Sequence, residues 1–286
     1  MVDKVFEELD QACIDEMASS IKIPPRPGVL LDLQEEFQKS DPDPQIIAEV
    51  ASRDVAICAA VLKVVNSPLY GNRRNLDSMS QAAMFLGLRQ VATLVTGLIA
   101  RKAIAAEGPS MARFWDVSAK RAFSVRFLAR KLRIGEADVA QTFGLFCDLG
   151  IPLLMKKFPN YLSTLAIANS SADKSFVEVE QSQHQTDHAL VGAIMSKTWG
   201  LSPAISMAIR IHHEYDQLGN SRVPDQVQDL VALGLLAEKI IQTLTGQNKT
   251  LEWERGGEAA LRQLSISDYE LNELSEDLRD ALSTGT

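Results

Sequence analysis

The sequence is poor in several features that would assign it to a broad class at once. Its 286 residues include only three cysteines, Cys13, Cys58 and Cys147, which are far apart and lie among apolar neighbours. This pattern suits a reducing compartment and offers neither a disulfide framework nor a Cys-x-x-Cys metal pair. A chain of this length can bury a sizeable core without such crosslinks.

Long apolar runs and a basic leader are also missing. The chain opens with Met-Val-Asp-Lys-Val-Phe-Glu-Glu-Leu-Asp, which carries acids where a secretory signal would carry bases. The longest apolar stretches, such as Val91 to Ala100, are shorter than the roughly 20 residues that span a bilayer. We therefore expect a cytoplasmic protein without a membrane partner.

An excess of basic residues is absent as well. The formal net charge is −8, so the chain as a whole has little attraction for a phosphate backbone, and no nucleic-acid partner is expected. The corner Leu86-Gly-Leu-Arg-Gln90 could be compared with a DNA-binding helix-turn-helix. Its surroundings are rich in Val, Leu and Ala and offer few donors to bases or phosphates, so this interpretation ranks last.

Alternating strand patterns, glycine-rich phosphate loops and internal repeats are not found, which leaves an all-α fold. Apolar residues instead recur at three- and four-residue steps and are interrupted by proline and glycine. Caps are expected at Asp43, Asp54, Ser175, Ser202 and Ser267. The pattern predicts helices over residues 4–17, 29–37, 55–66, 80–106 with a corner at Gly87, 111–132, 136–158 and 187–199, with others starting at 44, 176, 203 and 268.

A mild change of composition near Gly108 divides the chain into two helical lobes. The first covers residues 1–107 and has a proline-rich entry at Ile23-Pro-Pro-Arg-Pro27, while the second covers residues 108–286. Because no long flexible linker separates the lobes, we expect them to pack closely as one module with its core at about residues 20–245.

Several motifs occur in a specific order along both lobes. In the first lobe they are Ile23-Pro-Pro-Arg-Pro27, Asp54, Leu62-Lys-Val-Val-Asn-Ser-Pro-Leu-Tyr-Gly71 and Ser80-Gln-Ala-Ala-Met-Phe-Leu-Gly87. In the second they are Phe114-Trp115, Leu145-Phe-Cys-Asp-Leu-Gly150, Asp187-His-Ala-Leu-Val-Gly192, Trp199 and Ile211-His-His-Glu214. Together they resemble the HD-related output domain (HDOD) family. The resemblance implies a multi-helix, HD-like scaffold related to phosphohydrolases in which His and Asp side chains hold one or two divalent ions.

The residues at the implied metal positions argue against catalysis. The place of the first histidine holds Val117, and the paired His-Asp of the superfamily reads Cys147-Asp148. A closing aspartate is not evident within residues 230–239, where Glu238 is the only acid. Cys147 could bind zinc as a thiolate, but we favour a core role for this cysteine.

The remaining candidate ligands are few. Asp148, His188 and one of His212 or His213 match family positions, and adjacent helical residues point about 100° apart, so both His212 and His213 are not expected in one site. A catalytic metal needs about three converging ligands and an open position. We therefore expect neither a bound metal nor any other cofactor, with these four residues as the residual metal candidates.

Most candidates also have a structural interpretation, which we favour. Asp148-Leu-Gly150 could be a helix-breaking corner in which the carboxylate caps a backbone amide, and Asn66, Ser67 and Tyr70 could shape a helix end as well as a recognition site. Trp115 and Trp199 are expected to anchor packing, and His184 to be a solvated surface residue. The basic run is expected to form a solvated face; its members are Arg121, Arg126, Arg130, Lys131 and Arg133.

The leading functional hypothesis is a non-catalytic output or adaptor module of bacterial signal transduction. It would bind a regulatory protein partner, or a small ligand such as a nucleotide, in a groove between the lobes, and act in trans because no receiver, cyclase or kinase sequence accompanies it. The groove candidates are Asn66, Ser67, Tyr70, Asp148, His188, His212 and His213. The alternative is a residual metal-dependent phosphohydrolase that uses Asp148, His188 and His212 or His213 on a nucleotide or phosphodiester.

Overall fold

In the computed structural model, all regular elements among the described residues are helices, which confirms the all-α prediction. The structure describes residues 18–37, 39, 42–52, 55–67, 70, 76–104, 109–246 and 250–283. The helix expected at residues 4–17 and the cap expected at Asp54 lie outside these ranges.

Contacts along the chain divide it into two compact units. Unit 1 comprises Met1–Pro24 and Ala106–Leu274, and unit 2 comprises Pro25–Ala105 and Ser275–Thr286. The division expected from composition, at residues 107 and 108, places the first 24 residues and the last 12 differently. The helices within unit 2 are α3 (Gly28–Phe37), α4 (Pro44–Ser52), α5 (Val55–Val65), α6 (Met79–Leu86) and α7 (Leu88–Ile104).

Local signals in unit 2 act as the sequence indicates. The Asp43 carboxylate accepts a hydrogen bond from the Gln45 amide at 2.7 Å, and Pro44 opens α4. Helices α6 and α7 meet at Gly87, whose φ of +86° favours glycine. The predicted corner between two helices is therefore confirmed.

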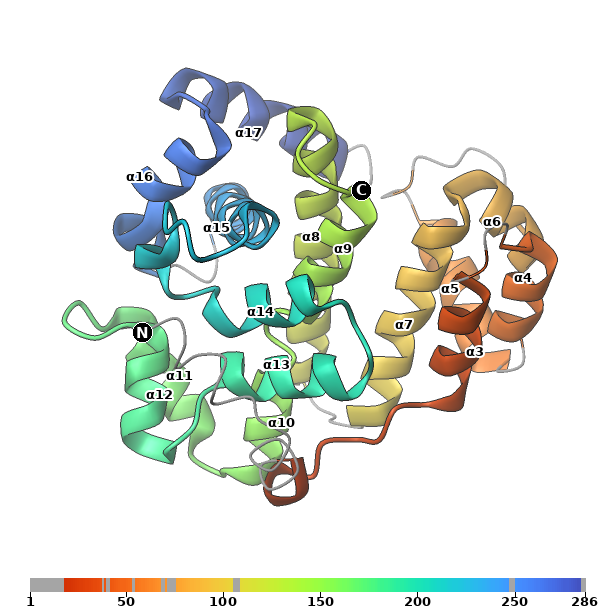
Figure 1. Cartoon of the computed structure of the whole chain (residues 1–286), viewed down its shortest axis with the longest axis horizontal. Coiled ribbons are helices and arrows are strands. Elements are labelled where there is room, and N and C mark those ends of the chain that lie inside the picture. The colour runs from red at the N-terminus through yellow and green to blue at the C-terminus, as the bar shows by residue number, and fades with distance from the viewer. Residues whose placement is uncertain are drawn as a thin grey trace. The chain divides into compact units, whose positions relative to one another are not determined.

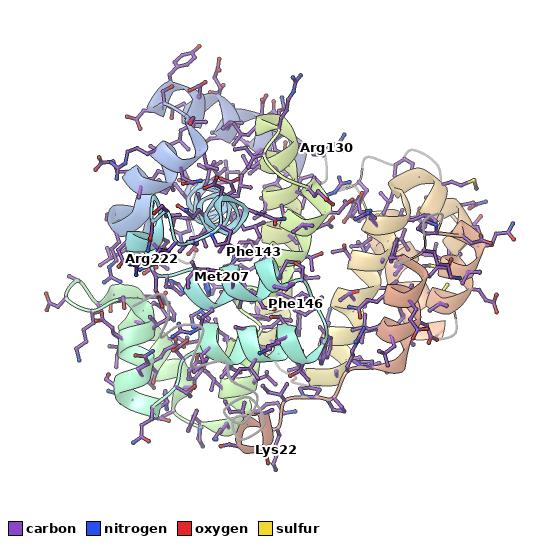
Figure 2. All side chains as sticks on the ribbon, viewed as in Figure 1. Lys22, Arg130, Phe143, Phe146, Met207 and Arg222 are labelled. Carbon is purple, nitrogen blue, oxygen red and sulfur yellow. The ribbon has the colours of Figure 1, made fainter. Side chains whose placement is uncertain are left out.

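Unit 1 is built around α15, which Figure 1 shows almost end-on with α8, α14 and α16 around it. Phe143 and Phe146, labelled in Figure 2, are buried in its interior, and Phe146 packs edge-on against Trp199. The elements of the unit are α8 (Pro109–Leu132), α9 (Ala137–Phe146), α10 (Gly150–Lys157), α11 (Tyr161–Ser170), α12 (Phe176–His184), α13 (His188–Thr198), α14 (Pro203–Ile211), the 3-10 turn η2 (Tyr215–Gln217), α15 (Asp225–Thr245), α16 (Glu252–Leu264) and the first part of α17 (Asp268–Ser283).

The prediction of a single helix over residues 136–158 was wrong. The chain turns at residues 147–149 and forms two helices, α9 and α10. Taken together, Ala137–Lys157 is long and apolar enough to cross a membrane by length and composition, but 61% of its most apolar window is buried inside the protein. It therefore serves as core of unit 1 in this structure, and the turn at its centre carries Cys147 and Asp148.

A glycine lets α10 and α13 approach closely. A Cβ atom on Gly150 would lie 2.0 Å from the backbone oxygen of His188, while one on Gly192, at the same crossing, would lie 3.5 Å from the Gly150 nitrogen and 3.1 Å from Ile209 of α14. Contacts under 3.0 Å to backbone cannot be relieved by rotating a side chain. The close crossing thus brings the first turn of α13 against the Cys147–Leu149 turn.

Two helix starts near this crossing are capped, one at the predicted Ser175 and the other at Asp187. The Asp187 carboxylate accepts from the Leu190 amide, and Ser175 forms a capping box with Glu178. Segment 18–24 is also tied to unit 1, because the Trp199 indole donates to the Pro24 carbonyl at 2.9 Å and Lys157 donates to Ser20. Trp199 is fully buried, in accord with its expected packing role.

Gly150→Ala tests the close crossing of α10 and α13. We expect a loss of about 3 kcal/mol in the free energy of unfolding, because the new methyl meets backbone atoms of His188 that cannot move alone. Chemical denaturation of the full chain measures it. Gly28→Ala is the control, since a Cβ there meets nothing within 4 Å, and its effect should stay within about 1 kcal/mol. Equal effects of the two variants would contradict the steric argument.

Candidate functional site

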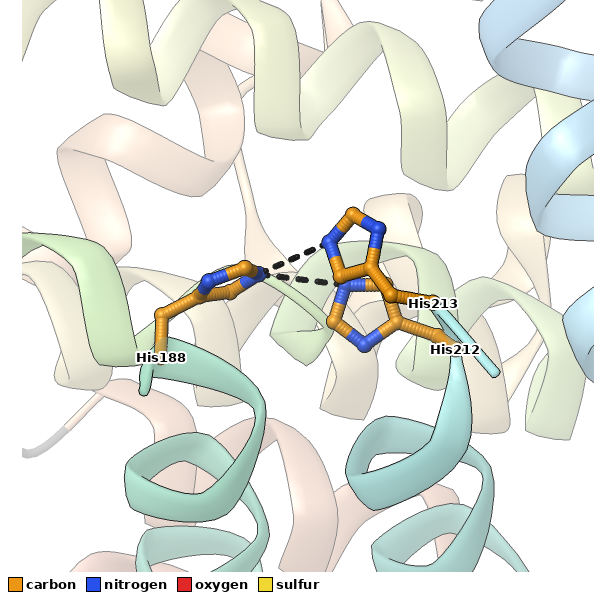
Figure 3. Close-up of side chains that lie close together, drawn as sticks. All are labelled: His188, His212 and His213. Carbon is orange, nitrogen blue, oxygen red and sulfur yellow. Dashed lines mark hydrogen bonds between the residues drawn. The ribbon is translucent and has the colours of Figure 1, made fainter. Parts of the chain in front are cut away.

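Three imidazole rings converge in unit 1. The Nε2 atom of His188 lies 3.3 Å from Nε2 of His212 and 3.1 Å from Nε2 of His213 (Figure 3). One ligand atom from each of the three lies within 4.8 Å of the others, the arrangement expected of a metal-binding group.

The end of α14 explains how neighbouring histidines enter one site. The helix ends at Ile211, His212 follows as its C-cap, and the chain then turns through His213. His188 faces them from the first residue of α13. The expectation that only one of His212 and His213 could enter was wrong, because it assumed that both belong to a continuing helix.

Each imidazole is held through its outer nitrogen. Nδ1 of His188 lies 2.7 Å from Oε2 of Glu180, and Nδ1 of His213 lies 2.6 Å from Oε2 of Glu252. Nδ1 of His212 lies 2.6 Å from the carbonyl oxygen of Ile209. Oxygen partners at Nδ1 leave the Nε2 atoms facing inward, which is how metal-binding histidines are usually oriented.

Further side chains hold the carboxylates of Glu180 and Glu252 in place by hydrogen bonds. The Tyr161 hydroxyl donates to Glu180, which is fully buried. The Tyr215 hydroxyl donates to Glu252 at 2.7 Å. Arg255 also donates to Glu252, and its other nitrogen donates to carbonyl oxygens in the α11–α12 connection. Buried carboxylates are stable only when paired and hydrogen-bonded, and these partners meet that need.

Asp148 lies beside the imidazoles and is paired with Arg121. Its Oδ1 is 3.4 Å from Nε2 of His212 and 3.7 Å from Nε2 of His188, while its Oδ2 accepts a hydrogen bond from Nη1 of Arg121. The chain does turn at residues 147–149, as expected of a helix-breaking corner, but α10 has no side-chain cap, so the predicted capping role of Asp148 was wrong. Arg121 is only 8% exposed, so its assignment to a solvated face was also wrong.

Electrostatics sets the charge of this pair. Burial by itself would raise the pKa of Asp148, but the charge of Arg121 and that of His188 bring it well below its usual value. Burial raises the pKa of the Cys147 thiol to about 12 despite the nearby Arg121, so the thiol is protonated at neutral pH. Cys147 is buried in the core, in accord with the structural interpretation.

Neighbouring groups shift the pKa values of two of the histidines in opposite directions. Burial would lower the pKa of His188, but the charge and hydrogen bond of Glu180, aided by Asp148, raise it to about 9. Burial and the adjacent His213 lower the pKa of His212 to about 4, against the effect of Asp148. In the metal-free protein at pH 7, His188 is therefore a cation and His212 is neutral.

A cavity of about 200 Å³ opens beside the cluster. Its polar end contains Arg121, Asp148, His188, His213, Glu238 and Glu252, and its walls are mostly apolar. Leu162 on α11 lines the cavity and is 54% exposed, so the cavity reaches the surface of unit 1. The arrangement can receive a small group with an apolar body and a polar end.

The other sequence candidates have different surroundings. Asn66, Ser67 and Tyr70 belong to unit 2, where the Asn66 amide pairs with both backbone groups of Leu76 and the Ser67 hydroxyl donates to the Val64 carbonyl. These contacts support the structural interpretation of the first two. His184 is not simply solvated, since it stacks on Phe158 and bonds to the Thr164 hydroxyl.

Sequence reasoning missed four charged residues of the site, which are Arg121, Glu180, Glu252 and Arg255. Two of them left a signal in the helical pattern. Arg121 lies four residues after Val117 and four before Val125, and Glu180 lies four residues after Phe176, so each falls on an apolar line of its helix. A charge at a predicted core position marks a buried pair, but its partner cannot be named without the fold.

Comparison with known proteins agrees with this architecture. A family model for the HDOD domain matches residues 23–215. A protein of Treponema pallidum (strain Nichols), named only as uncharacterized, is 25% identical over 228 residues, which are 79% of this chain and 43% of that protein. The chain thus spans less than half the length of that relative.

Solved structures share the fold at low identity. An HDOD domain protein of unknown function from Geobacter sulfurreducens has a TM-score of 0.71 at 20% identity, with 96% of this chain and 97% of that chain covered. A candidate phosphohydrolase from Shewanella amazonensis has a TM-score of 0.71 at 20% sequence identity, with 94% of each chain covered. A candidate signal transduction protein from Marinobacter aquaeolei has a TM-score of 0.71 at 17% sequence identity, with 94% of this chain and 60% of that chain covered.

Glu180→Gln tests the electrostatic support of His188. A raised pKa in the folded state adds stability below the unfolded value of 6.5, and this stability is lost as pH rises through about 9. In the presence of a chelator, we expect the variant to lose about 3 kcal/mol of unfolding free energy at pH 6 and much less at pH 10. Denaturation at both pH values measures the difference. Glu258→Gln, at an exposed residue of α16, is the control, and a loss independent of pH would contradict the assignment.

Proposed function

This chain belongs to the HDOD domain family, and from that premise we propose that it is a non-catalytic signal-transduction module. It recognises a regulatory protein partner at the HD-like centre of unit 1 and does not turn over a phosphoester. The observation that carries the proposal is the ion pair of Asp148 with Arg121, because it removes from the centre the carboxylate oxygen that a second metal ion would need.

One half of the centre fits a single metal ion. Bonds of about 2.0–2.1 Å from zinc to imidazole nitrogen place neighbouring ligands of a tetrahedron roughly 3.3 Å apart. The Nε2 separations of 3.1 and 3.3 Å match this spacing. His188, His212 and His213 would hold the ion, and Oδ1 of Asp148 lies on the same side. A bound ion would fix the ring positions and polarise an oxygen ligand. The sequence-based expectation of no metal rested on too low a count of imidazoles.

The other half of the centre does not fit a metal. The hydrolytic arrangement with two ions needs ligands on both sides of a shared group. Here the second side contains the Val117 side chain, the protonated Cys147 thiol and the guanidinium of Arg121. Valine and guanidinium offer no ligand atom, and the Cys147 thiol, which is protonated and bonded to Arg121 in the metal-free protein, would have to lose both its proton and this contact to bind a cation.

The cavity favours a protein side chain as the ligand. Binding sites for whole small molecules usually enclose about 300–1,000 Å³, so a cavity of about 200 Å³ is small for a nucleotide. Its apolar walls, formed in part by Phe114, Leu165 and Phe176, suit the stem of a partner side chain. The polar groups at its inner end suit a polar tip. We keep a nucleotide as the second ligand class.

The alternative function is a residual phosphohydrolase with one metal ion. The observation in its favour is that His188 and His213 line the cavity next to Arg121, so a substrate oxygen could approach a bound ion. Three imidazoles with an open fourth position form a known catalytic ligand set. This alternative predicts metal-dependent turnover.

Hydrolysis assays separate the two functions. Full-length protein loaded with Mn²⁺, Fe²⁺ or Zn²⁺ is incubated with bis-para-nitrophenyl phosphate and with cyclic dinucleotides. We expect the wild-type chain to hydrolyse these compounds at a rate within about twofold of that of the His188→Ala variant. The reason is that Arg121 and Val117 lie where a second catalytic cation and one of its ligands would be needed. Turnover at least about tenfold above that variant, a difference of about 1.4 kcal/mol in the barrier, would support the alternative.

Partner recognition is tested by filling the cavity. Leu165→Trp places a larger side chain into the cavity lining, whereas Ile167→Trp alters an exposed residue of the same helix that does not line it. We expect a partner recovered with the wild-type chain from host cells to bind Leu165→Trp at least about tenfold more weakly, since its anchoring side chain is excluded. Binding to Ile167→Trp should be unchanged. Equal retention of the partner by both variants would count against the cavity, once circular dichroism shows that both are folded.

A further inference from the structure

We infer that the guanidinium of Arg121 is a built-in replacement for a second metal cation and limits the centre to one ion. The inference rests on the proposed single-ion site, but it concerns a different side of the centre. It assigns to Arg121 a role in metal stoichiometry.

The contacts of Arg121 are those of a cation among potential ligands. Its Nη1 donates to Oδ2 of Asp148 and lies 3.1 Å from Sγ of Cys147. Glu238, on the facing helix α15, lines the same two cavities as Arg121. The side chain is only 10% exposed, so solvent does not screen these interactions strongly. One positive group thus engages the acidic side of the centre.

Asp148 divides its two oxygens between the two sides. Oδ1 faces the imidazoles of His188 and His212, and Oδ2 is bonded to Arg121. A carboxylate with an ion on each side would be divided in the same way. The guanidinium retains its charge at any pH at which the protein is folded, so it cannot give way by losing a proton.

On its inner side, Arg121 also borders a space too small for an ion with its water shell. A cavity of about 20 Å³ is lined by Arg121, Cys147, Asp148, His212 and Glu238. A cavity of this volume holds about one water molecule. With Arg121 in place, this inner space has no room for a hydrated cation, and toward the larger cavity, which Arg121, Asp148 and Glu238 also line, the guanidinium charge opposes a second cation.

The position of Arg121 on α8 makes this exclusion a property of one side chain. Arg121 lies one helical turn after Val117, and both residues line the larger cavity. Replacing the guanidinium by a shorter imidazole would remove the cation and provide a nitrogen ligand on the same helix face. Asp148 and Glu238 would then lose their cationic partner and be available to a metal.

The test is the number of Mn²⁺ ions bound per full-length chain at pH 7.5, measured by electron paramagnetic resonance of free Mn²⁺ and by native mass spectrometry. We expect Arg121→His to bind one ion more than the wild type, two in place of one. Arg121→Lys keeps the charge and should bind the wild-type number. Arg126→His, also on α8 but paired with Asp138, is the positional control and should add no ion.

The outcomes separate this inference from the proposed function. An Arg121→His variant that is folded and binds only the wild-type number would overturn the inference, as would two ions in the wild type. A wild type without any ion would overturn the single-ion site, while an added ion in Arg121→His would still support the role of Arg121. If Arg121→His does not fold, Arg121→Gln is used, and a rise of its melting temperature with Mn²⁺ that exceeds the wild-type rise is expected. An equal rise would contradict the inference.

Discussion

The buried ion pair between Arg121 and Asp148 is the interaction on which the centre of unit 1 depends. It joins the middle of α8 to the turn between α9 and α10, and the free oxygen of the same carboxylate faces the imidazoles. A buried pair adds little net stability over an apolar pair, but the loss of one partner costs about 3–5 kcal/mol. The main effect of the pair is therefore on which charged groups can bind at the site, and its net contribution to the stability of the fold is small.

The packing of helices around this pair decides what the site can do. The crossing at Gly150 and Gly192 brings α13 against the turn that carries Asp148, and the end of α14 brings in the last two histidines. Tyrosine and glutamate partners then hold the rings of His188 and His213 from behind. Preorganised imidazoles on one side and a fixed guanidinium on the other are consistent with recognition at this centre in place of hydrolysis.

Much of the fold was accessible from local patterns, and the site was accessible in part. The corner at Gly87 and the caps at Asp187 and Ser175 follow from residue chemistry that acts within a few positions. Cys147 and Trp199 were placed in the core because of their apolar neighbours. The break after Phe146 was predicted in part, because Asp148-Leu-Gly150 was interpreted as a helix-breaking corner while the apolar periodicity predicted one helix over residues 136–158. The approach of α13 to Gly150 explains why the chain turns there.

From the amino-acid sequence we inferred the all-α class, the family and four side chains of the centre, because helical periodicity, capping and motif order are encoded over short distances. The four side chains are Asp148, His188, His212 and His213. Tertiary structure alone decided that His212 and His213 both face His188, that Glu180 and Glu252 support them, and that Arg121 is buried against Asp148. The physical reason is that these contacts join residues up to 39 positions apart. Their geometry depends on where helices end and cross, and their energies depend on burial that no local pattern specifies.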